Sequence, residues 1–360
     1  MKSKLLLIFC ITTLLPAWHI ITLARKENIQ FFPATDKRIR YTGRIDFSNP
    51  DMPRFWAPGV YIEIVFEGPA CEMVINDEVL YGRQYNYLQI LVDGKTLTRV
   101  QTTGKQNTIK IASGLAKGNH TALICKCTES GVGFLELVGF NCADLKPLPP
   151  AHKLKMEFIG NSITCGSGTD QSVKPCGQGE WYDQQNAFNS YGPVAARVLK
   201  AQWHLTAVSG IGLIKSCCNM TITMPQVYDK INMRENSGLW DPGNYHPDII
   251  TVCLGQNDGL QDTILFRQKY ILFIRQLRKV HPSAKIFCIS SPMANEELAA
   301  YQRKNLGVII AALHSEGDGK VWSYFFTQRY HKGCGDHPDL QEHQQIADEL
   351  VKAIQQRSAG

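Results

Sequence analysis

Apolar and polar residues alternate with a period of two in short runs along the first half of the chain. In Tyr61–Glu67 every second residue is apolar, as in a strand with one buried face. Tyr87–Asp93 repeats the pattern, and Asp93-Gly94 predicts a hairpin turn into the next strand. Further strand candidates are Lys95–Val100, Asn107–Ala112, Thr121–Cys127 and Gly133–Phe140. Regular short strands without a helical period predict a β-sandwich of jelly-roll type over residues 35–143.

The pattern changes after residues 144–153, a segment with three prolines that we interpret as a stiff linker. Beyond it, apolar runs of strand length alternate with segments of helical period. The strand candidates are Leu154–Gly160, Trp203–Val208, Ile249–Leu254, Lys285–Ser290 and Lys320–Phe325, and the helical segments are Ala187–Lys200, Thr263–Lys279, Glu296–Leu313 and Leu340–Gln355. This alternation predicts an α/β domain over residues 154–360, with a parallel sheet covered by helices on both faces. In such a sheet, reactive groups collect in loops at the carboxyl ends of the strands.

Residues 1–24 have the composition of an export signal. Lys2 and Lys4 precede the apolar stretch Leu5–Leu15, and Ala24 supplies a small residue for cleavage. An uncleaved membrane anchor is the alternative, because the apolar stretch continues loosely to Ala24. We favour cleavage, which predicts an exported protein, periplasmic or extracellular, with no membrane attachment after signal removal.

The overall composition limits the partners and cofactors to consider. Apolar residues make up 44% and charged residues 19%, as in an ordinary globular protein. The net charge is +6, but Lys and Arg are scattered, so we expect no nucleic-acid partner. Of the twelve cysteines, Cys10 lies in the expected signal, and the other eleven leave at least one thiol unpaired unless chains cross-link. Their spacing matches no zinc site, and Cys253 and Cys288, inside apolar runs, are predicted to be core thiols.

Three residues suited to acyl-transfer chemistry follow predicted strands of the second half. Ser162, which follows the first strand, can act as a nucleophile, although serine is also common in turns. Gly210 can bring a backbone N–H close to a substrate carbonyl, or simply form a flexible turn. Asn257 can direct its amide NH₂ at the same oxygen, or cap a turn or helix. The sequence contains no Gly-x-Ser-x-Gly motif, which disfavours an ordinary α/β-hydrolase.

The position of His337 makes it the candidate general base. It follows the last predicted strand and precedes the last helix, whereas His246 and His281, which also precede prolines, do not. A neutral imidazole can take the serine proton and return it to a leaving alcohol. His343, in the following helix, is predicted to be a surface or packing residue.

The order Ser, Gly, Asn and His at strand ends resembles the SGNH (GDSL-type) hydrolases. The stretches that carry this resemblance are Gly160-Asn-Ser162, Ser209-Gly210, Gly255-Gln-Asn257-Asp258 and Asp336-His-Pro338. More closely, the chain resembles carbohydrate esterase family 2 over nearly all of its mature length. The supporting stretches are Phe158–Gly166, Met224–Tyr228 and Gly333–Pro338.

This resemblance implies a jelly-roll domain followed by a flavodoxin-like, three-layer α/β/α domain of SGNH type. It also implies that Ser162 is the nucleophile and that His337 is the general base. The oxyanion hole is then formed by the N–H of Gly210, the side chain of Asn257 and the N–H of Ser162.

Two positions depart from the superfamily pattern. Asn161 stands where the superfamily usually has Asp, a change that keeps a hydrogen-bonding side chain. Cys334 stands three residues before the histidine, where the superfamily usually has the triad acid, and Asp336 is poorly placed to reach the ring of its immediate neighbour. Because members of family 2 often work with a Ser–His dyad, our hypothesis is that a backbone carbonyl near Cys334 orients His337.

The implied reaction is hydrolysis of O-acetyl esters on a plant polysaccharide such as xylan or glucomannan, through an acetyl-Ser162 intermediate and without metal or organic cofactor. Trp181, Tyr182 and Trp240 lie in loops, where they either stack on sugar rings or pack under the loop. The N-terminal module either binds carbohydrate or buttresses its neighbour. Other interpretations are an SGNH lipase or small-ester hydrolase, acyl transfer to another sugar, and a carbohydrate-binding protein with an inactive esterase domain. The intact set of four site residues argues against the last.

Overall fold

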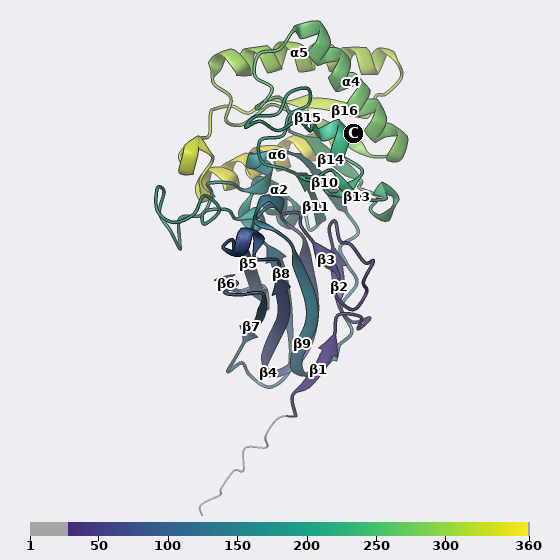
Figure 1. Ribbon diagram of the computed structural model, residues 1–360. Coiled ribbons are helices and arrows are strands. Elements are labelled where there is room, and N and C mark those ends of the chain that lie inside the picture. Colours follow the sequence, from purple (N-terminus) through teal and green to yellow (C-terminus); the bar gives the residue numbers. More distant parts are fainter. Residues whose placement is uncertain (1–27, 359–360) are drawn as a thin grey trace, which may run out of the picture.

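The computed structural model describes residues 28–358 as two domains, each built on its own sheet. Figure 1 places the N-terminal β domain at the bottom of the view and the helix-rich C-terminal domain at the top. The prediction of an antiparallel β domain followed by a parallel-sheet α/β domain is therefore confirmed. The expected signal segment, residues 1–24, lies outside the described residues.

The N-terminal domain is a nine-stranded antiparallel sheet that curves around its own core. Its strands are β1 (Gln30–Pro33), β2 (Arg40–Thr42), β3 (Arg54–Phe55), β4 (Tyr61–Asp77), β5 (Tyr87–Val92), β6 (Thr96–Gln101), β7 (Gln106–Ala112), β8 (Asn119–Lys126) and β9 (Leu135–Lys146). The first half of β4 pairs with β8 and the second half with β7, while β9 pairs along both halves. Register shifts next to Cys71 bend β4, as β-bulges do, so that its two halves pair with different strands of the curved sheet.

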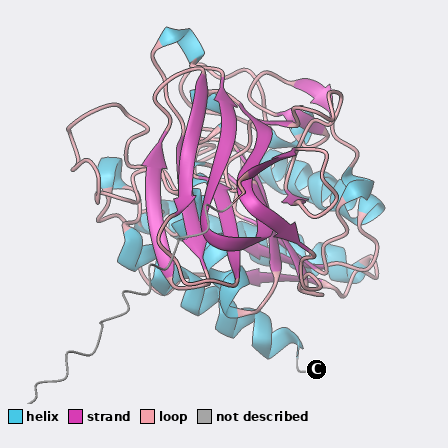
Figure 2. Cartoon of the chain, turned by 90° about the horizontal axis from the view of Figure 1, so that it is seen from below, coloured by secondary structure: helices cyan, strands magenta, loops and turns pink. Residues whose placement is uncertain are grey.

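The core of this domain follows from the alternation along the strands. In β7, for example, Asn107, Ile109 and Ile111 are buried, whereas the residues between them are exposed. The predicted hairpin also forms, because Asp93 and Gly94 both adopt positive φ, 52° and 64°, as a tight turn between β5 and β6 requires. Figure 2 shows the resulting strands side by side, with the helices of the other domain beyond them.

The C-terminal domain is a five-stranded parallel sheet in the order β11-β10-β14-β15-β16. The strands are β10 (Lys155–Gly160), β11 (Gln202–Ala207), β14 (Ile249–Val252), β15 (Lys285–Ile289) and β16 (Val321–Tyr324). The chain starts at β10, adds β11 on one side and continues with β14 on the other. This order is the flavodoxin-like one, and it makes the carboxyl end of β10 a topological switch point, where ligands bind in such sheets.

Helices cover both faces of the parallel sheet. The helices α2 (Tyr191–Val198) and α6 (Leu340–Ser358) pack together on one face, and α4 (Thr263–Val280) and α5 (Glu296–Ser315) pack on the other. The sequence patterns predict all four helices and all five strands, with ends shifted by a few residues. The short elements α1 (Ser162–Cys165) and α3 (Met224–Val227) and the hairpin of β12 (Lys230–Asn232) and β13 (Ser237–Leu239) were not anticipated.

The two domains share a buried interface along the edge strand β11. The rings of Trp203 in β11 and Tyr61 in β4 lie 4.1 Å apart between centroids. Arg44 of the first domain is fully buried, donates to the carbonyl of Tyr228 at 2.7 Å and lies 3.7 Å from the carboxylate of Glu157. Removing one partner of such a buried ion pair is strongly destabilising. The interface therefore fixes the orientation of the two domains relative to each other.

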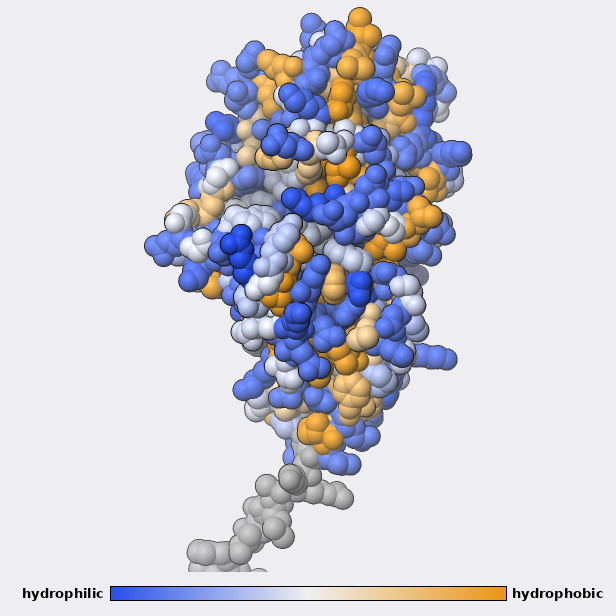
Figure 3. Space-filling model, in the orientation of Figure 1, coloured by the Kyte–Doolittle hydropathy of each residue, from blue (hydrophilic) through white to orange (hydrophobic). Residues whose placement is uncertain are grey.

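Strand structure extends beyond the expected domain boundaries at two places. Strand β1 begins at Gln30, before residue 35, and β9 continues to Lys146, inside the segment interpreted as a linker. The boundaries at 35, 143 and 154 stay predictions. Within residues 28–358, no helix has the length and apolarity needed to cross a membrane. On the face seen in Figure 3, hydrophobic residues are scattered among hydrophilic ones.

Candidate active site

The four residues singled out from the sequence meet in one cleft. Ser162, Gly210, Asn257 and His337 follow β10, β11, β14 and β16, respectively. All four line a cavity of about 630 Å³. Parallel strands bring their carboxyl ends to one edge of the sheet, which explains how residues so far apart in sequence converge.

A tight turn after β10 presents Ser162 at the start of α1. Asn161 caps this short helix, because its Oδ1 accepts the N–H of Ile163 at 3.2 Å. The departure from Asp at position 161 thus keeps the capping function. Gly160 is required for space, since a Cβ at this position would lie 2.1 Å from Oγ1 of Thr164.

Ser162 and His337 form a hydrogen-bonded pair, with 2.9 Å between Oγ and Nε2. On the other side of the ring, Nδ1 lies 2.9 Å from the carbonyl oxygen of Gly335. A carbonyl oxygen can only accept, so Nδ1 carries the proton and the lone pair of Nε2 faces the serine hydroxyl. This is the tautomer that a general base for Ser162 needs.

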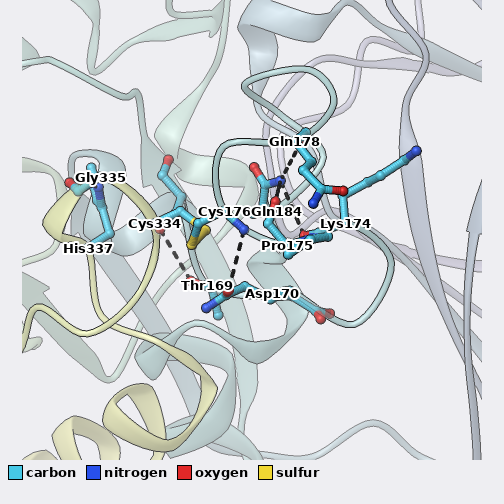
Figure 4. The surroundings of a disulfide bond; sticks show 12 residues. Thr169, Asp170, Lys174, Pro175, Cys176, Gln178, Gln184, Cys334, Gly335 and His337 are labelled. Carbon is cyan, nitrogen blue, oxygen red and sulfur yellow. Dashed lines mark hydrogen bonds between the residues drawn. A yellow bond between two sulfur atoms is a disulfide. The ribbon is translucent and has the colours of Figure 1, made fainter.

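The loop that carries His337 is held by a disulfide, which Figure 4 shows, and by close backbone packing. Cys334 forms a disulfide with Cys176, and its N–H donates to the carbonyl of Gly168 at 2.9 Å. Gly168 has φ of +67°, and a Cβ there would lie 2.2 Å from the carbonyl oxygen of Cys334. The position of the usual triad acid is therefore occupied by a cystine that ties the His337 loop to a neighbouring loop. Asp336 is exposed and does not bond to the ring of His337.

Burial lowers the pKa of His337 below its ordinary value of 6.5, while the carbonyls of Gly335 and Cys334 and the charges of Glu129 and Asp336 oppose the change. The neutral ring therefore persists into mildly acidic solution, as a base requires. His343 is fully buried, and its Nδ1 accepts the N–H of Tyr191 at 3.1 Å, so of the two predicted roles, surface or packing, it has the packing role.

Three residues that can donate hydrogen bonds to an oxyanion, Ser162, Gly210 and Asn257, line the same cleft. In the part of the chain that the structure describes, neither the N–H of Ser162 nor that of Gly210 has an acceptor. Asn257 donates one amide hydrogen to the carbonyl of Ile211 at 2.9 Å, which leaves its second hydrogen free. Asp258 supports the segment beyond, because its carboxylate accepts the backbone N–H groups of Leu213, Ile214 and Lys215 at 2.6–3.1 Å. Fixed donors of this kind can stabilise an oxyanion.

The three aromatic residues considered for stacking on a sugar differ in their exposure and location. Trp181 lines the cleft and is 52% exposed, so its ring is available to a ligand. Tyr182 is buried at 1% exposure, and Trp240 is buried at 9% and lines a different cavity. Of the three, only Trp181 can offer a stacking surface in this cleft.

Several residues of the cleft were not anticipated from the sequence. These are Glu129, which comes from the N-terminal domain, Gln185, and the adjacent cysteines 217 and 218, which are joined by a disulfide. The adjacency of the two cysteines was the only sequence signal among them. Cys253 and Cys288 are free and buried, as predicted. Among the described residues, no group of His, Cys, Asp and Glu side chains is arranged to hold a metal ion.

The chain is similar to known proteins along both domains. Residues 41–151 match the model "Carbohydrate esterase 2 N-terminal", and residues 158–357 match the GDSL-like lipase/acylhydrolase family. Cellulase/esterase CelE of Acetivibrio thermocellus is 31% identical over 329 residues, which cover 89% of this chain but 39% of that protein. This chain therefore spans well under half the length of that relative.

Two further matches extend over most of this chain and most of the matched protein. An acetylxylan esterase / glucomannan deacetylase of Cellvibrio japonicus is 26% identical over 83% of this chain and 84% of its own length. The structure of a family two carbohydrate esterase from Clostridium thermocellum in complex with cellohexaose aligns with a TM-score of 0.81 and 29% identity. The alignment covers 89% of this chain and 99% of the chain in that structure.

Proposed function

Since the chain belongs to the GDSL-like lipase/acylhydrolase family, and within it to carbohydrate esterase family 2, we propose that it is a serine esterase that removes O-acetyl groups from a polysaccharide. The observation that carries the proposal is the 2.9 Å contact of Ser162 Oγ with His337 Nε2, inside a cleft that also holds unused N–H donors. In this proposal Ser162 is the nucleophile and His337 the general base.

Acylation begins when Nε2 of His337 takes the proton of Ser162 as Oγ attacks the acetyl carbonyl. As the carbonyl oxygen becomes negatively charged, it accepts hydrogen bonds from the N–H groups of Ser162 and Gly210 and from the side-chain amide of Asn257. Each such donor typically contributes on the order of 10²–10³ to the rate. Collapse of the tetrahedral intermediate breaks the ester bond, and His337 returns its proton to the departing sugar hydroxyl.

Deacylation repeats these steps with water. His337 takes a proton from water, the hydroxide attacks the acetyl-Ser162 carbonyl, and acetate leaves as the proton returns to Oγ. The imidazolium formed in each half is oriented by the carbonyl of Gly335 rather than by a carboxylate. Ser162 and His337 thus act as a dyad, with no metal or organic cofactor.

The cleft offers a sugar both an aromatic ring to stack on and polar groups to bind. The exposed ring of Trp181 shares the cleft with polar side chains that can bind hydroxyl groups: Ser167, Arg234 and Gln256. An aromatic platform beside such groups suits a sugar ring, whereas a lipase needs a long apolar groove. Xylan and glucomannan are the proposed substrates. Export through the expected signal segment, residues 1–24, belongs to the same proposal, because these polymers lie outside the cell.

The test is acetate release from acetylated xylan and acetylated glucomannan by the mature protein, with Ser162→Ala as the matched control. We expect release by the unaltered protein and none above background by the variant. Esters with acetyl and octanoyl groups on the same leaving alcohol distinguish the lipase interpretation, because the octanoyl ester should be the much poorer substrate. If neither protein released acetate but both bound the polymers, the esterase proposal would be wrong and the chain would be a carbohydrate-binding protein.

A further inference from the structure

A carboxylate of the N-terminal domain enters the active-site cleft. Glu129 lies in the loop between β8 and the turn Ser130–Val132, and its side chain is buried at 1% exposure. Lys126, which is fully buried, anchors this loop by donating from Nζ to the carbonyls of Thr128 at 2.7 Å and Glu129 at 3.2 Å. The loop is therefore well fixed before it reaches the cleft.

The carboxylate of Glu129 binds two segments of the other domain. Its Oε2 accepts the backbone N–H of Ser209 at 2.8 Å, and its Oε1 accepts the amide of Gln185 at 3.0 Å. Gln185 returns the contact, because its Oε1 accepts the backbone N–H of Glu129 at 3.0 Å. Both oxygens of the carboxylate are thus used, one of them on the residue immediately before Gly210.

We propose that Glu129 is a positioning residue for the esterase reaction, which holds the Val208–Ser209 peptide and thereby directs the next N–H, that of Gly210, toward the reacting oxygen. This inference rests on the proposed function. Gly210 has φ of +83° and belongs to no helix or strand, so regular structure does not set its orientation. Its carbonyl accepts the N–H of Cys217 at 2.8 Å on the other side. The peptides before and after the Gly210 N–H are therefore both held, and Glu129 provides the contact from the N-terminal domain.

The charge of Glu129 has a second effect, on His337. Neighbouring negative charge favours the imidazolium, and Glu129 acts to raise the pKa of His337 against the dominant lowering by burial. In a dyad without a triad acid, this carboxylate is a source of charge that stabilises the imidazolium. The other charged or titratable groups around the two residues are Lys126, Asp77, Cys165, Asp336, His343 and Arg234.

The experiment compares three forms with the unaltered chain: Glu129→Ala, Glu129→Gln, and the exchange Glu129→Gln with Gln185→Glu. We expect Glu129→Ala to lower kcat by on the order of 10²-fold, since small displacements of catalytic groups cost this much, with KM changed about threefold or less. The exchange restores the hydrogen bonds, because the amide at 129 can accept from Ser209 and donate to the carboxylate at 185. It should recover at least about tenfold of the lost kcat.

The pH profile separates the charge from the geometry. Because Glu129→Gln removes a negative charge facing His337, the acid limb of kcat/KM should move to lower pH, a shift that a merely structural role would not cause. Thermal unfolding of each variant checks that it folds, and the nearly isosteric Glu129→Gln keeps the test valid if Glu129→Ala does not.

Two results would overturn the inference while leaving the esterase proposal intact. One is an active parent with a Glu129→Ala form that keeps kcat within about twofold. The other is an exchange variant as slow as Glu129→Ala together with an acid limb of kcat/KM that does not move in Glu129→Gln. An inactive parent enzyme would instead contradict the proposed function itself.

Discussion

Replacing Asp336 by Asn tests whether the active site works as a dyad. Asp336 immediately precedes His337 and is exposed, and the ring nitrogen Nδ1 bonds to the carbonyl of Gly335 instead. The substitution keeps size and shape and removes one charge. It therefore asks whether this carboxylate holds the imidazole or merely lies beside it.

The expected effect follows from the exposure of Asp336. Two unit charges 4 Å apart in water interact by about 1 kcal/mol, and dissolved salt weakens this further. The charge can therefore change kcat by at most about fivefold. Loss of the proposed base, in His337→Ala, should lower kcat by on the order of 10⁴-fold or more. Removing the negative charge also lowers the pKa of His337, so the acid limb of kcat/KM should move slightly to lower pH.

The assay is hydrolysis of 4-nitrophenyl acetate, followed across the pH range, by the parent, Asp336→Asn and His337→Ala. Asp348→Asn, which removes an exposed carboxylate of α6, is the matched control and should leave the profile unchanged. If Asp336→Asn were as slow as His337→Ala, Asp336 would be a triad acid and the dyad interpretation would be refuted.

Three other predictions concern the same site. Replacing both Cys176 and Cys334 by Ser removes the brace of the His337 loop and should lower the free energy of unfolding by about 2–5 kcal/mol, measured by denaturant titration. Gly168→Ala should lower kcat by about tenfold or more in the acetyl ester assay, because the new Cβ meets the carbonyl of Cys334 and lies 3.1 Å from Cβ of His337; an unchanged kcat would contradict this packing argument. Asn257→Ala should lower kcat by on the order of 10²–10³ with little change in KM, and a change confined to KM would exclude it as an oxyanion donor.

Much of the architecture could be predicted because it is local. The period-two runs in the first half and the alternation of apolar runs with helical segments in the second predict the strands and helices that form. The placement of Ser162, Gly210, Asn257 and His337 after parallel strands also predicts their convergence, since such strands end at the same edge. Those members of the candidate site that directly follow a predicted strand could therefore be located from the sequence.

The remainder depends on contacts that have no sequence signature. The partner of His337 Nδ1 is the carbonyl of Gly335, next to Cys334, which confirms the hypothesis drawn from the family resemblance. The sequence alone does not mark this carbonyl, because every residue has one. Cys176 and Cys334 are 158 positions apart, and among many cysteines their pairing depends on which loops the fold brings together. Glu129 lies in the other domain, within a stretch whose pattern predicts only strands and turns.

The sequence by itself therefore determined the two sheets, their order and the four residues at the strand ends, because short-range periodicity and strand direction decide these. Only the tertiary structure decided which carbonyl near Cys334 orients His337, and which groups hold its loop and the backbone around Gly210. Those groups are a carbonyl, a cystine and a carboxylate from the other domain, brought together by packing between distant segments. Their chemistry is common in any chain, and only their positions in the fold make them specific to this cleft.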